Sequence, residues 1–357
     1  MRHTGTCRQI ALIAACAAFL GAACGGSHPS QQAARPRPAI ASPSPAASPS
    51  ARTSLVAPGV ACPTTGQPVA GAGSLQAALK LAAPGTVIRL APGIYTGNFV
   101  ATASGTSGAP ITLCGPAEAV IDGGDIRTGY GLHLDKASYW SLLGFSVQNA
   151  QKGVVIDHAS HVLISGLYVH SIGDEAIHLR AASSDNIVEN TMVRDTGHLI
   201  ARFGEGIYVG SAHSNWCNYT ACGPDTSDRN VIRGNDVAQT TAENVDIKEG
   251  TTGGVIADNK FSGAGMVSSA ATAWVNVKGN GWTITGNTGF GSVGDGFQVH
   301  EVYAGWGQHN VFHGNQANVN GPGFGFYVQR SSLGTVVGCD NTATGAAKGL
   351  SNLGCAG

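Results

Sequence analysis

The chain has 357 residues and a formal net charge of −1, and only 11% of its residues are charged. This balance provides no broad basic surface for nucleic acid, and no nucleic-acid-binding motif is present. Glycine occurs 52 times, and the abundance of Val, Ile, Thr and Asn over Glu, Lys and Met favours strands and tight turns.

The first 23 residues are typical of an export signal peptide. Arg2 and Arg8 give it a positive start, and the apolar stretch 10–23 is too short to anchor the chain across a bilayer. Residues 20–24 resemble a bacterial lipoprotein cleavage site, which implies a lipidated Cys24, with ordinary secretion as the alternative. We therefore expect a monomeric protein that a bacterium secretes or displays on its surface. Its only membrane contact would be the N-terminal lipid anchor.

Residues 24–58 are rich in proline, alanine and serine and have few large apolar side chains. Such a segment cannot bury enough apolar surface to fold, so we expect a disordered linker ahead of one domain, 59–357. The linker would hold the domain away from the membrane or cell wall.

Six cysteines follow Cys24, and an even number in an exported chain suggests disulfides. We expect three pairs: Cys62 with Cys114, Cys217 with Cys222, and Cys339 with Cys355. Zinc binding is the alternative, but the spacing does not give two close cysteine pairs supported by histidines.

Two short segments alternate along most of the chain, with a period of about 22 to 30 residues. One ends in asparagine and recurs at 186–190, 231–235, 255–259, 283–287 and 311–315. The other alternates apolar and polar residues, as in Ile177-His178-Leu179, which sends one side chain inward and the next outward. Stacking of these repeats predicts an all-β parallel β-helix, a solenoid. Its recurring asparagines, which tolerate left-handed conformations, would form a ladder at one bend.

The N-terminal part resembles the start of proteins of the pectin-lyase-like superfamily. The segments that carry the resemblance are 73–79, 85–90, 92–95, 105–113 and 120–123. Chondroitinase-B-like and pectate-lyase-like enzymes begin in much this way. The resemblance extends over 60–357 and implies a right-handed parallel β-helix with a short N-terminal capping helix. Lyases, hydrolases, epimerases and phage adhesins share this fold, so the fold alone does not imply one chemistry.

Aligned copies of the alternating segment bring three glutamates to the same place in successive coils: Glu175, Glu205 and Glu243. Like charges on neighbouring strands repel one another. These carboxylates therefore either extend into water and pair with cationic residues, or share a cation. Calcium takes several carboxylate oxygens as ligands, so we expect a Ca²⁺ site formed by the three glutamates and Asp246.

Lys248 is the candidate general base. Its segment, 243–250, resembles the catalytic-lysine coil of calcium-dependent β-helix lyases, although Lys278 stands where alginate-lyase-like families have an arginine. Removing the C5 proton of a uronate adds charge beside a carboxylate, so the site needs cationic groups and a base. We expect Lys278 and a bound cation to lower the pKa of Lys248. The alternative is an outer-face lysine paired with Glu243 or Asp246.

The other candidates lie on the same outer face or in the loop after residue 210. The catalytic candidates are Lys248, Lys278, Tyr208 and His178, and the last two could protonate a leaving group. The candidates for substrate binding are Arg180, Asn276, Gln298, His300 and Trp216. Trp216 is expected to stack on a sugar ring, with burial of hydrophobic surface as the alternative.

Together these residues predict an extracellular polysaccharide lyase that cleaves a uronic-acid polymer by β-elimination, with Ca²⁺ as cofactor and an acidic polysaccharide as partner. A glycoside hydrolase is the first alternative, using a carboxylate pair such as Glu205 with Glu243 or Asp246. A surface protein that binds carbohydrate without catalysis is the second.

Overall fold

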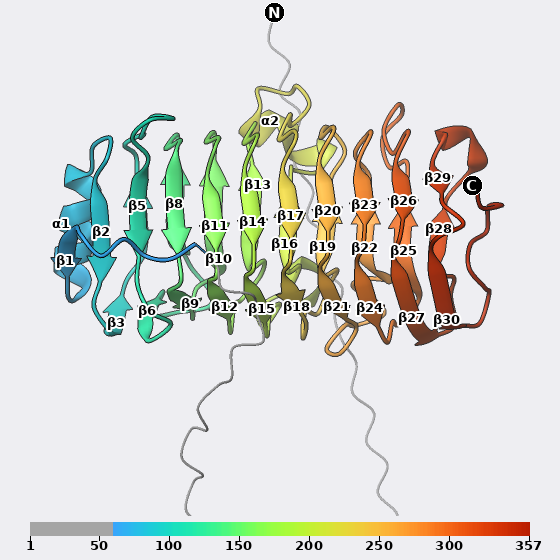
Figure 1. Cartoon of the computed structure of the whole chain (residues 1–357), viewed down its shortest axis with the longest axis horizontal. Helices are drawn as coiled ribbons and strands as arrows, with labels where there is room; N and C mark the ends of the chain where they lie inside the picture. Colours follow the sequence, from blue (N-terminus) through green and yellow to red (C-terminus); the bar gives the residue numbers. More distant parts are fainter. Residues whose placement is uncertain (1–59) are drawn as a thin grey trace, which may run out of the picture. The chain divides into compact units, whose positions relative to one another are not determined.

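The computed structural model describes residues 60–357, so the predicted signal peptide, Cys24 and the 24–58 linker lie outside the described residues. Residues 60–357 wind into a stack of coils along which three sheets run (Figure 1). Corresponding strands of successive coils pair in parallel, as β13 (Ile177–Arg180) does with β16 (Ile207–Val209). The all-β parallel β-helix expected from the repeats is therefore confirmed.

Each sheet contains one strand from most coils. Sheet A consists of β1 (Gln67–Val69), β2 (Val87–Leu90), β5 (Ile111–Cys114), β8 (Trp140–Leu143), β11 (Leu163–Ser165), β14 (Ile187–Glu189), β17 (Val231–Arg233), β20 (Val255–Ala257), β23 (Thr283–Thr285), β26 (Val311–His313) and β29 (Val336–Val337). Sheet B consists of β3 (Gly93–Thr96), β6 (Ala119–Asp122), β9 (Ser146–Gln148), β12 (Tyr168–His170), β15 (Met192–Arg194), β18 (Asp236–Val237), β21 (Lys260–Ser262), β24 (Thr288–Phe290), β27 (Gln316–Gly321) and β30 (Thr342–Ala346). Sheet C consists of β4 (Phe99–Ala101), β7 (Tyr130–Asp135), β10 (Lys152–Asp157), β13, β16, β19 (Val245–Ile247), β22 (Ala273–Val277), β25 (Asp295–Val299) and β28 (Phe326–Val328).

The two sequence repeats correspond to sheets A and C, whereas sheet B was not predicted. The strands of sheet B from β9 to β24 have only two or three residues, and Val169 is the one fully buried residue of β12. A single inward side chain gives no alternation, so the period-2 signal is absent from these strands.

The core is a continuous column of inward-pointing aliphatic and aromatic side chains. In sheet A, Ile164, Val188, Ile232 and Ile256 of successive coils are fully buried and in register. The expected capping helix is α1 (Ala72–Leu81), which buries Leu75, Ala78 and Leu79 against the first coils. This helix covers an end of the column that would otherwise lie open to water.

An asparagine ladder joins the later coils, as predicted. Asn287 Oδ1 accepts hydrogen bonds from the backbone N and Nδ2 of Asn259, and its own Nδ2 donates to Asn315 Oδ1. The ladder side chains are buried, and it is the preceding residues, such as Gly286 and Gly314, that adopt the left-handed conformation. Glycine has no Cβ to clash there. The expected hydrogen bonds to the next coil are therefore present. Asn190, the asparagine of the 186–190 copy, instead aligns with Gly234 and adopts the positive φ itself.

All three expected disulfides are present: Cys62–Cys114, Cys217–Cys222 and Cys339–Cys355. The remaining helices are short and lie in loops: α2 (Trp216–Tyr219) and the single 3₁₀ turns η1 (Ala201–Phe203), η2 (His213–Asn215) and η3 (Ser331–Leu333). Within residues 60–357, no helix has the length and apolar character needed to cross a membrane.

Candidate active site

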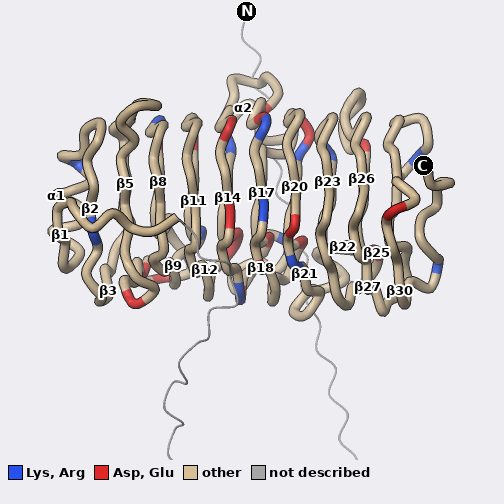
Figure 2. The backbone as a smooth tube through the Cα atoms, viewed as in Figure 1, with Lys and Arg blue, Asp and Glu red and all other residues tan. Residues whose placement is uncertain are grey.

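The outer face of sheet C carries the candidate site. Alternate residues of a strand point to the same face, and the parallel register aligns them from coil to coil. The middle residues of five successive strands form one row: His178, Tyr208, Asp246, Asn276 and Gln298. Many of the charged positions lie on these central coils (Figure 2). The rows predicted from the repeats are therefore present.

Asp246 is the centre of the site because it binds two lysines. Its Oδ2 lies 2.6 Å from Nζ of Lys248, and its Oδ1 lies 2.5 Å from Nζ of Lys278 on the next coil. Burial would raise the pKa of Asp246, but the two ammonium groups outweigh it and hold the pKa below its usual range. Asp246 is therefore ionised and positions both lysines.

Glu205 and Glu243 complete an acidic cluster with Asp246. One carboxylate oxygen of each residue lies within 4.8 Å of the others. Burial raises the pKa of both glutamates, and the neighbouring carboxylates raise it further. Glu243 Oε1 accepts a hydrogen bond from Asn276 Nδ2 at 3.1 Å, whereas the buried Oε2 of Glu205 has no hydrogen-bond partner.

These three carboxylates fit a hard cation such as Ca²⁺. Two lysines neutralise only two of the three charges, so the third carboxylate must take up a proton or a cation. The unpartnered Glu205 oxygen is the kind of ligand that calcium accepts. Glu175 is not part of the cluster, because its carboxylate pairs with Lys152. This pairing corrects the prediction that Glu175 is a metal ligand.

The pKa of Lys248 shifts opposite to the expectation. Burial would lower it, but Asp246, Tyr208 and Glu205 together raise it well above its usual range. The expected lowering was to come from Lys278 and a bound cation; without an ion, Asp246 binds both ammonium groups and offsets the repulsion between them. Lys248 is therefore protonated in this arrangement, and so a base role requires a further change in charge.

Tyr208 lies directly beside this lysine. The Lys248 ammonium is 4.8 Å from the centre of the Tyr208 ring, a cation–π distance. Burial raises the pKa of Tyr208 well above its usual range. The hydroxyl therefore keeps its proton at neutral pH and remains a candidate proton donor.

His178 is not placed to donate a proton to substrate. Its Nε2–H donates a hydrogen bond to the carbonyl oxygen of Gly210 at 2.9 Å. Burial lowers its pKa well below the usual range, and Arg180 and Lys152 lower it further. The ring is thus a neutral imidazole whose only N–H is already used. It packs edge-on against Tyr208 at 4.2 Å and positions that ring, while its catalytic role stays a prediction.

Asn276 connects His300 to the acidic cluster. Its Oδ1 lies 2.9 Å from His300 Nδ1, and because the amide oxygen can only accept, Nδ1 carries the hydrogen. Burial and Lys278 lower the pKa of His300, so Nε2 of the neutral ring is left as an acceptor. Asn276 thus orients its neighbours, and both ends of its amide are engaged within the protein. Its direct contact with substrate stays a prediction.

Two further predicted substrate ligands are also engaged within the protein. Arg180 forms a two-point ion pair with Asp157, at 2.7 and 3.0 Å, and lies 4.4 Å from the ring centre of Tyr219. The Gln298 amide accepts from Thr272 Oγ1 and donates to an oxygen of Asp295. The structure thus ties both side chains to neighbouring residues, and their contact with substrate stays a prediction.

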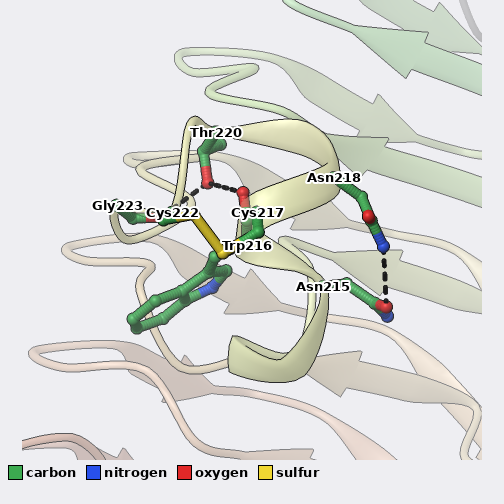
Figure 3. Close-up of a disulfide and its surroundings, with 7 residues drawn as sticks. All are labelled: Asn215, Trp216, Cys217, Asn218, Thr220, Cys222 and Gly223. Carbon is green, nitrogen blue, oxygen red and sulfur yellow. Dashed lines mark hydrogen bonds between the residues drawn. A yellow bond between two sulfur atoms is a disulfide. The ribbon is translucent and has the colours of Figure 1, made fainter. Parts of the chain in front are cut away.

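Trp216 lies under the loop that follows β16 rather than on the surface of that loop (Figure 3). Only 6% of it is exposed, and its indole nitrogen donates to the carbonyl of Ser211. Tyr303 covers it, with ring centres 5.3 Å apart, and is itself 45% exposed. The expected exposed tryptophan is therefore wrong, and the burial alternative is correct. The exposed ring of this pair is that of Tyr303, from a loop three coils further on.

Comparison with known proteins places this site in a family. Residues 56–198 match the family described as "Pel9A-like, right handed beta helix region", and residues 216–356 match "Right handed beta helix region". The crystal structure of alginate lyase from Paenibacillus sp. str. FPU-7 is 36% identical, with a TM-score of 0.71, over 81% of this chain and 95% of that one. The chain belongs to the pectin-lyase-like superfamily of right-handed parallel β-helix proteins.

Two more distant members of the superfamily share the fold. Pectate lyase Pel9A is 18% identical with a TM-score of 0.55, over 79% of this chain and 73% of that one. A mannuronic acid specific polysaccharide family 6 lyase from human gut microbiota is 16% identical with a TM-score of 0.53, over 76% and 66%. No curated protein sequence matches the chain. The superfamily member described here is thus similar to polysaccharide lyases, and its right-handed fold agrees with the sequence prediction.

Proposed function

We propose that the protein is a polysaccharide lyase that cleaves a uronic-acid polymer by β-elimination, with alginate as the first substrate to test. The observation that carries the proposal is the grouping of Tyr208, Lys248 and Lys278 around a buried carboxylate cluster on the outer face of sheet C. The 36% identity to an alginate lyase over most of both chains supports it.

Each residue has a distinct role in this proposal. The ammonium group of Lys278 attracts the uronate carboxylate and stabilises the charge that develops there. Lys248 takes the C5 proton after giving up its own, and Tyr208 donates its retained proton to the leaving oxygen at C4. The C5–H and C4–O bonds break, and a C4–C5 double bond forms. His178 and Asn276 act by holding Tyr208 and Glu243 in place.

Calcium is the cofactor that we propose for the acidic cluster, with Glu205, Glu243 and Asp246 as its protein ligands. Bound there, the ion would offset the negative charge that raises the Lys248 pKa and so make the lysine a better base. The buried, unpartnered oxygen of Glu205 supports this assignment.

A glycoside hydrolase is the alternative on the same face. Retaining hydrolases need two carboxyl groups about 5 to 5.5 Å apart, and one oxygen each of Glu205, Glu243 and Asp246 lies within 4.8 Å of the others. Elimination is favoured because both oxygens of Asp246 pair with lysines and because the chain is 36% identical to an alginate lyase.

We further propose that the protein acts outside the cell as a monomer, either secreted or held by the lipid anchor predicted at Cys24. The three disulfides support an oxidising compartment, and substrates of this size do not cross membranes unaided.

The test is incubation of the purified domain with alginate, polygalacturonate and glycosaminoglycan in the presence of calcium. Ultraviolet absorbance of the new double bond is followed beside an assay of reducing ends. A parallel rise in both on one polymer supports elimination and identifies the substrate. Reducing ends without absorbance would overturn the lyase proposal in favour of hydrolysis, and binding without either product would leave a carbohydrate-binding protein.

A further inference from the structure

Tyr303 and His213 form an exposed pair of rings beside the site. Their centres lie 4.9 Å apart with 30° between the planes, and 45% of Tyr303 and 44% of the His213 side chain are exposed. His213 follows β16, and Tyr303 follows β25. We call this pair the Tyr303–His213 platform.

The two loops that form the platform leave sheet C beyond the same ends of its strands. The loop with His213 begins after Gly210, and the loop with Tyr303 begins after His300. Both of these residues belong to the outward row that also contains Lys248 and Lys278. The strands between them, β19 and β22, carry those two lysines at their ends. The platform therefore lies at the same strand ends of sheet C as the two lysines.

The platform is held rigidly from below. Trp216 packs under Tyr303 at 70° between the planes, and Cys217–Cys222 closes the α2 loop that carries it (Figure 3). Rigid aromatic rings lose little conformational entropy when they bind a ligand. Because the Tyr303 ring is half-exposed and held in place, it is suited to bind a ligand.

His213 is oriented by a buried carboxylate. Glu249 is 1% exposed, and its Oε1 accepts hydrogen bonds from the backbone N of His213 at 2.7 Å and from Nδ1 at 2.9 Å. Because Nδ1 is the donor to this carboxylate, Nε2 is left to bond a ligand. Glu249 directly follows Lys248, so the side chain that orients the platform is one peptide bond from the central lysine.

We propose that the Tyr303–His213 platform is a saccharide subsite, in which the apolar C–H face of one pyranose ring of the polymer stacks on Tyr303 while His213 Nε2 bonds a hydroxyl or carboxylate of the same unit. The inference rests on the proposed function for the identity of the polymer. Tyrosine suits this role because its ring offers a flat apolar surface.

The test compares Tyr303→Ala and Tyr303→Phe with Phe290→Ala, which removes another exposed aromatic ring, from sheet B and not from sheet C. We expect Tyr303→Ala to raise KM about tenfold with kcat within about twofold, because the platform binds substrate without touching the reacting atoms. Tyr303→Phe keeps the stacking face and should keep the wild-type KM, as should Phe290→Ala. His213→Ala should raise KM, as Tyr303→Ala does.

Calorimetric titration of the same variants with alginate oligosaccharides separates this proposal from the proposed function. If no polymer is cleaved but oligosaccharide binds, the lyase proposal fails, and a weaker affinity of Tyr303→Ala alone still supports the subsite. Equal affinity or equal KM of wild type and Tyr303→Ala overturns the subsite even where elimination is observed. A wild-type protein that binds no saccharide of the panel overturns it as well.

Discussion

Lys248 and Asp246 lie two residues apart at the end of β19 and form an ion pair with 2.6 Å between Nζ and Oδ2. Alternate residues of a strand share a face, so the strand itself brings the central lysine to the carboxylate that holds its proton. The same carboxylate binds Lys278 of the next coil. Catalysis at this site therefore depends on what changes the charge around Asp246.

Replacing Lys248 should remove elimination but leave the fold and polymer binding intact. We expect Lys248→Ala to lower kcat by about 10³-fold, within the range typical of general acid–base groups. Asp246 keeps its bond to Lys278, so the buried carboxylate is not left without a partner. Lys260→Ala, at an exposed position of β21, is the matched control. Retention of a tenth or more of the wild-type kcat in Lys248→Ala would contradict the base role.

Calcium removal should make stability depend on pH through Glu205. The pKa of Glu205 is raised in the folded state above its ordinary value of 4.5, so the folded form binds the proton more tightly than the unfolded form. The stabilisation is present below pH 4.5 and is lost as the pH rises toward the raised pKa. In a chelator we therefore expect Tm to fall as the pH rises above 4.5.

Thermal melts from pH 4 to 9, with and without calcium, measure this dependence. Calcium should restore Tm at neutral pH, and Glu205→Gln should flatten the pH profile and abolish the response to calcium. An identical Tm with calcium and with chelator across this range would exclude a stabilising ion at the cluster.

His178 should remain neutral where an ordinary histidine titrates. Burial lowers its pKa well below 6.5, and its Nε2–H is donated to Gly210. In ¹⁵N-resolved imidazole spectra, one ring should show the Nε2–H tautomer with no shift between pH 7.5 and 5.5, and this signal should be missing in His178→Gln. A titrating signal lost in that variant would refute the assignment. The unfolded chain takes up a proton on this histidine near pH 6.5, whereas the folded chain does not. The free energy of unfolding should therefore fall as the pH drops below 6.5.

The asparagine ladder should contribute several hydrogen bonds per residue to stability. Asn287→Ala leaves the buried backbone N–H of Asn259 and the carbonyl of Ile256 without their partners. We expect it to lower the free energy of unfolding by about 2 to 4 kcal/mol, as loss of buried partners does. Urea unfolding measures the change, and Asn218→Ala, at an exposed loop position, should stay within about 0.5 kcal/mol of wild type. Equal losses of unfolding free energy in Asn287→Ala and Asn218→Ala would show that a ladder asparagine contributes no more than an exposed one.

Much of the candidate site follows from the repeat alone. Aligning Ile177-His178-Leu179 with Val245-Asp246-Ile247 is enough to place His178 and Asp246 in one outward row, because the period of a strand is two. Glu205 and Glu243 are found by the same alignment. The pairing state of each group is not contained in the alignment, and Glu175 shows why: its partner, Lys152, lies one coil away.

The sequence by itself determined the coil: its inward aliphatic positions, its asparagine ladder and its outer row of polar residues, which recur from coil to coil. The three disulfide pairs were also expected from the sequence. The tertiary structure alone decided which charges meet and which aromatic ring is exposed. Lys278 reaches Asp246 from another coil, and Tyr303 covers Trp216 from a loop three coils on. Such contacts depend on how loops of unequal length fold over the coils, and the energies of buried charges depend on every neighbour within a few ångströms.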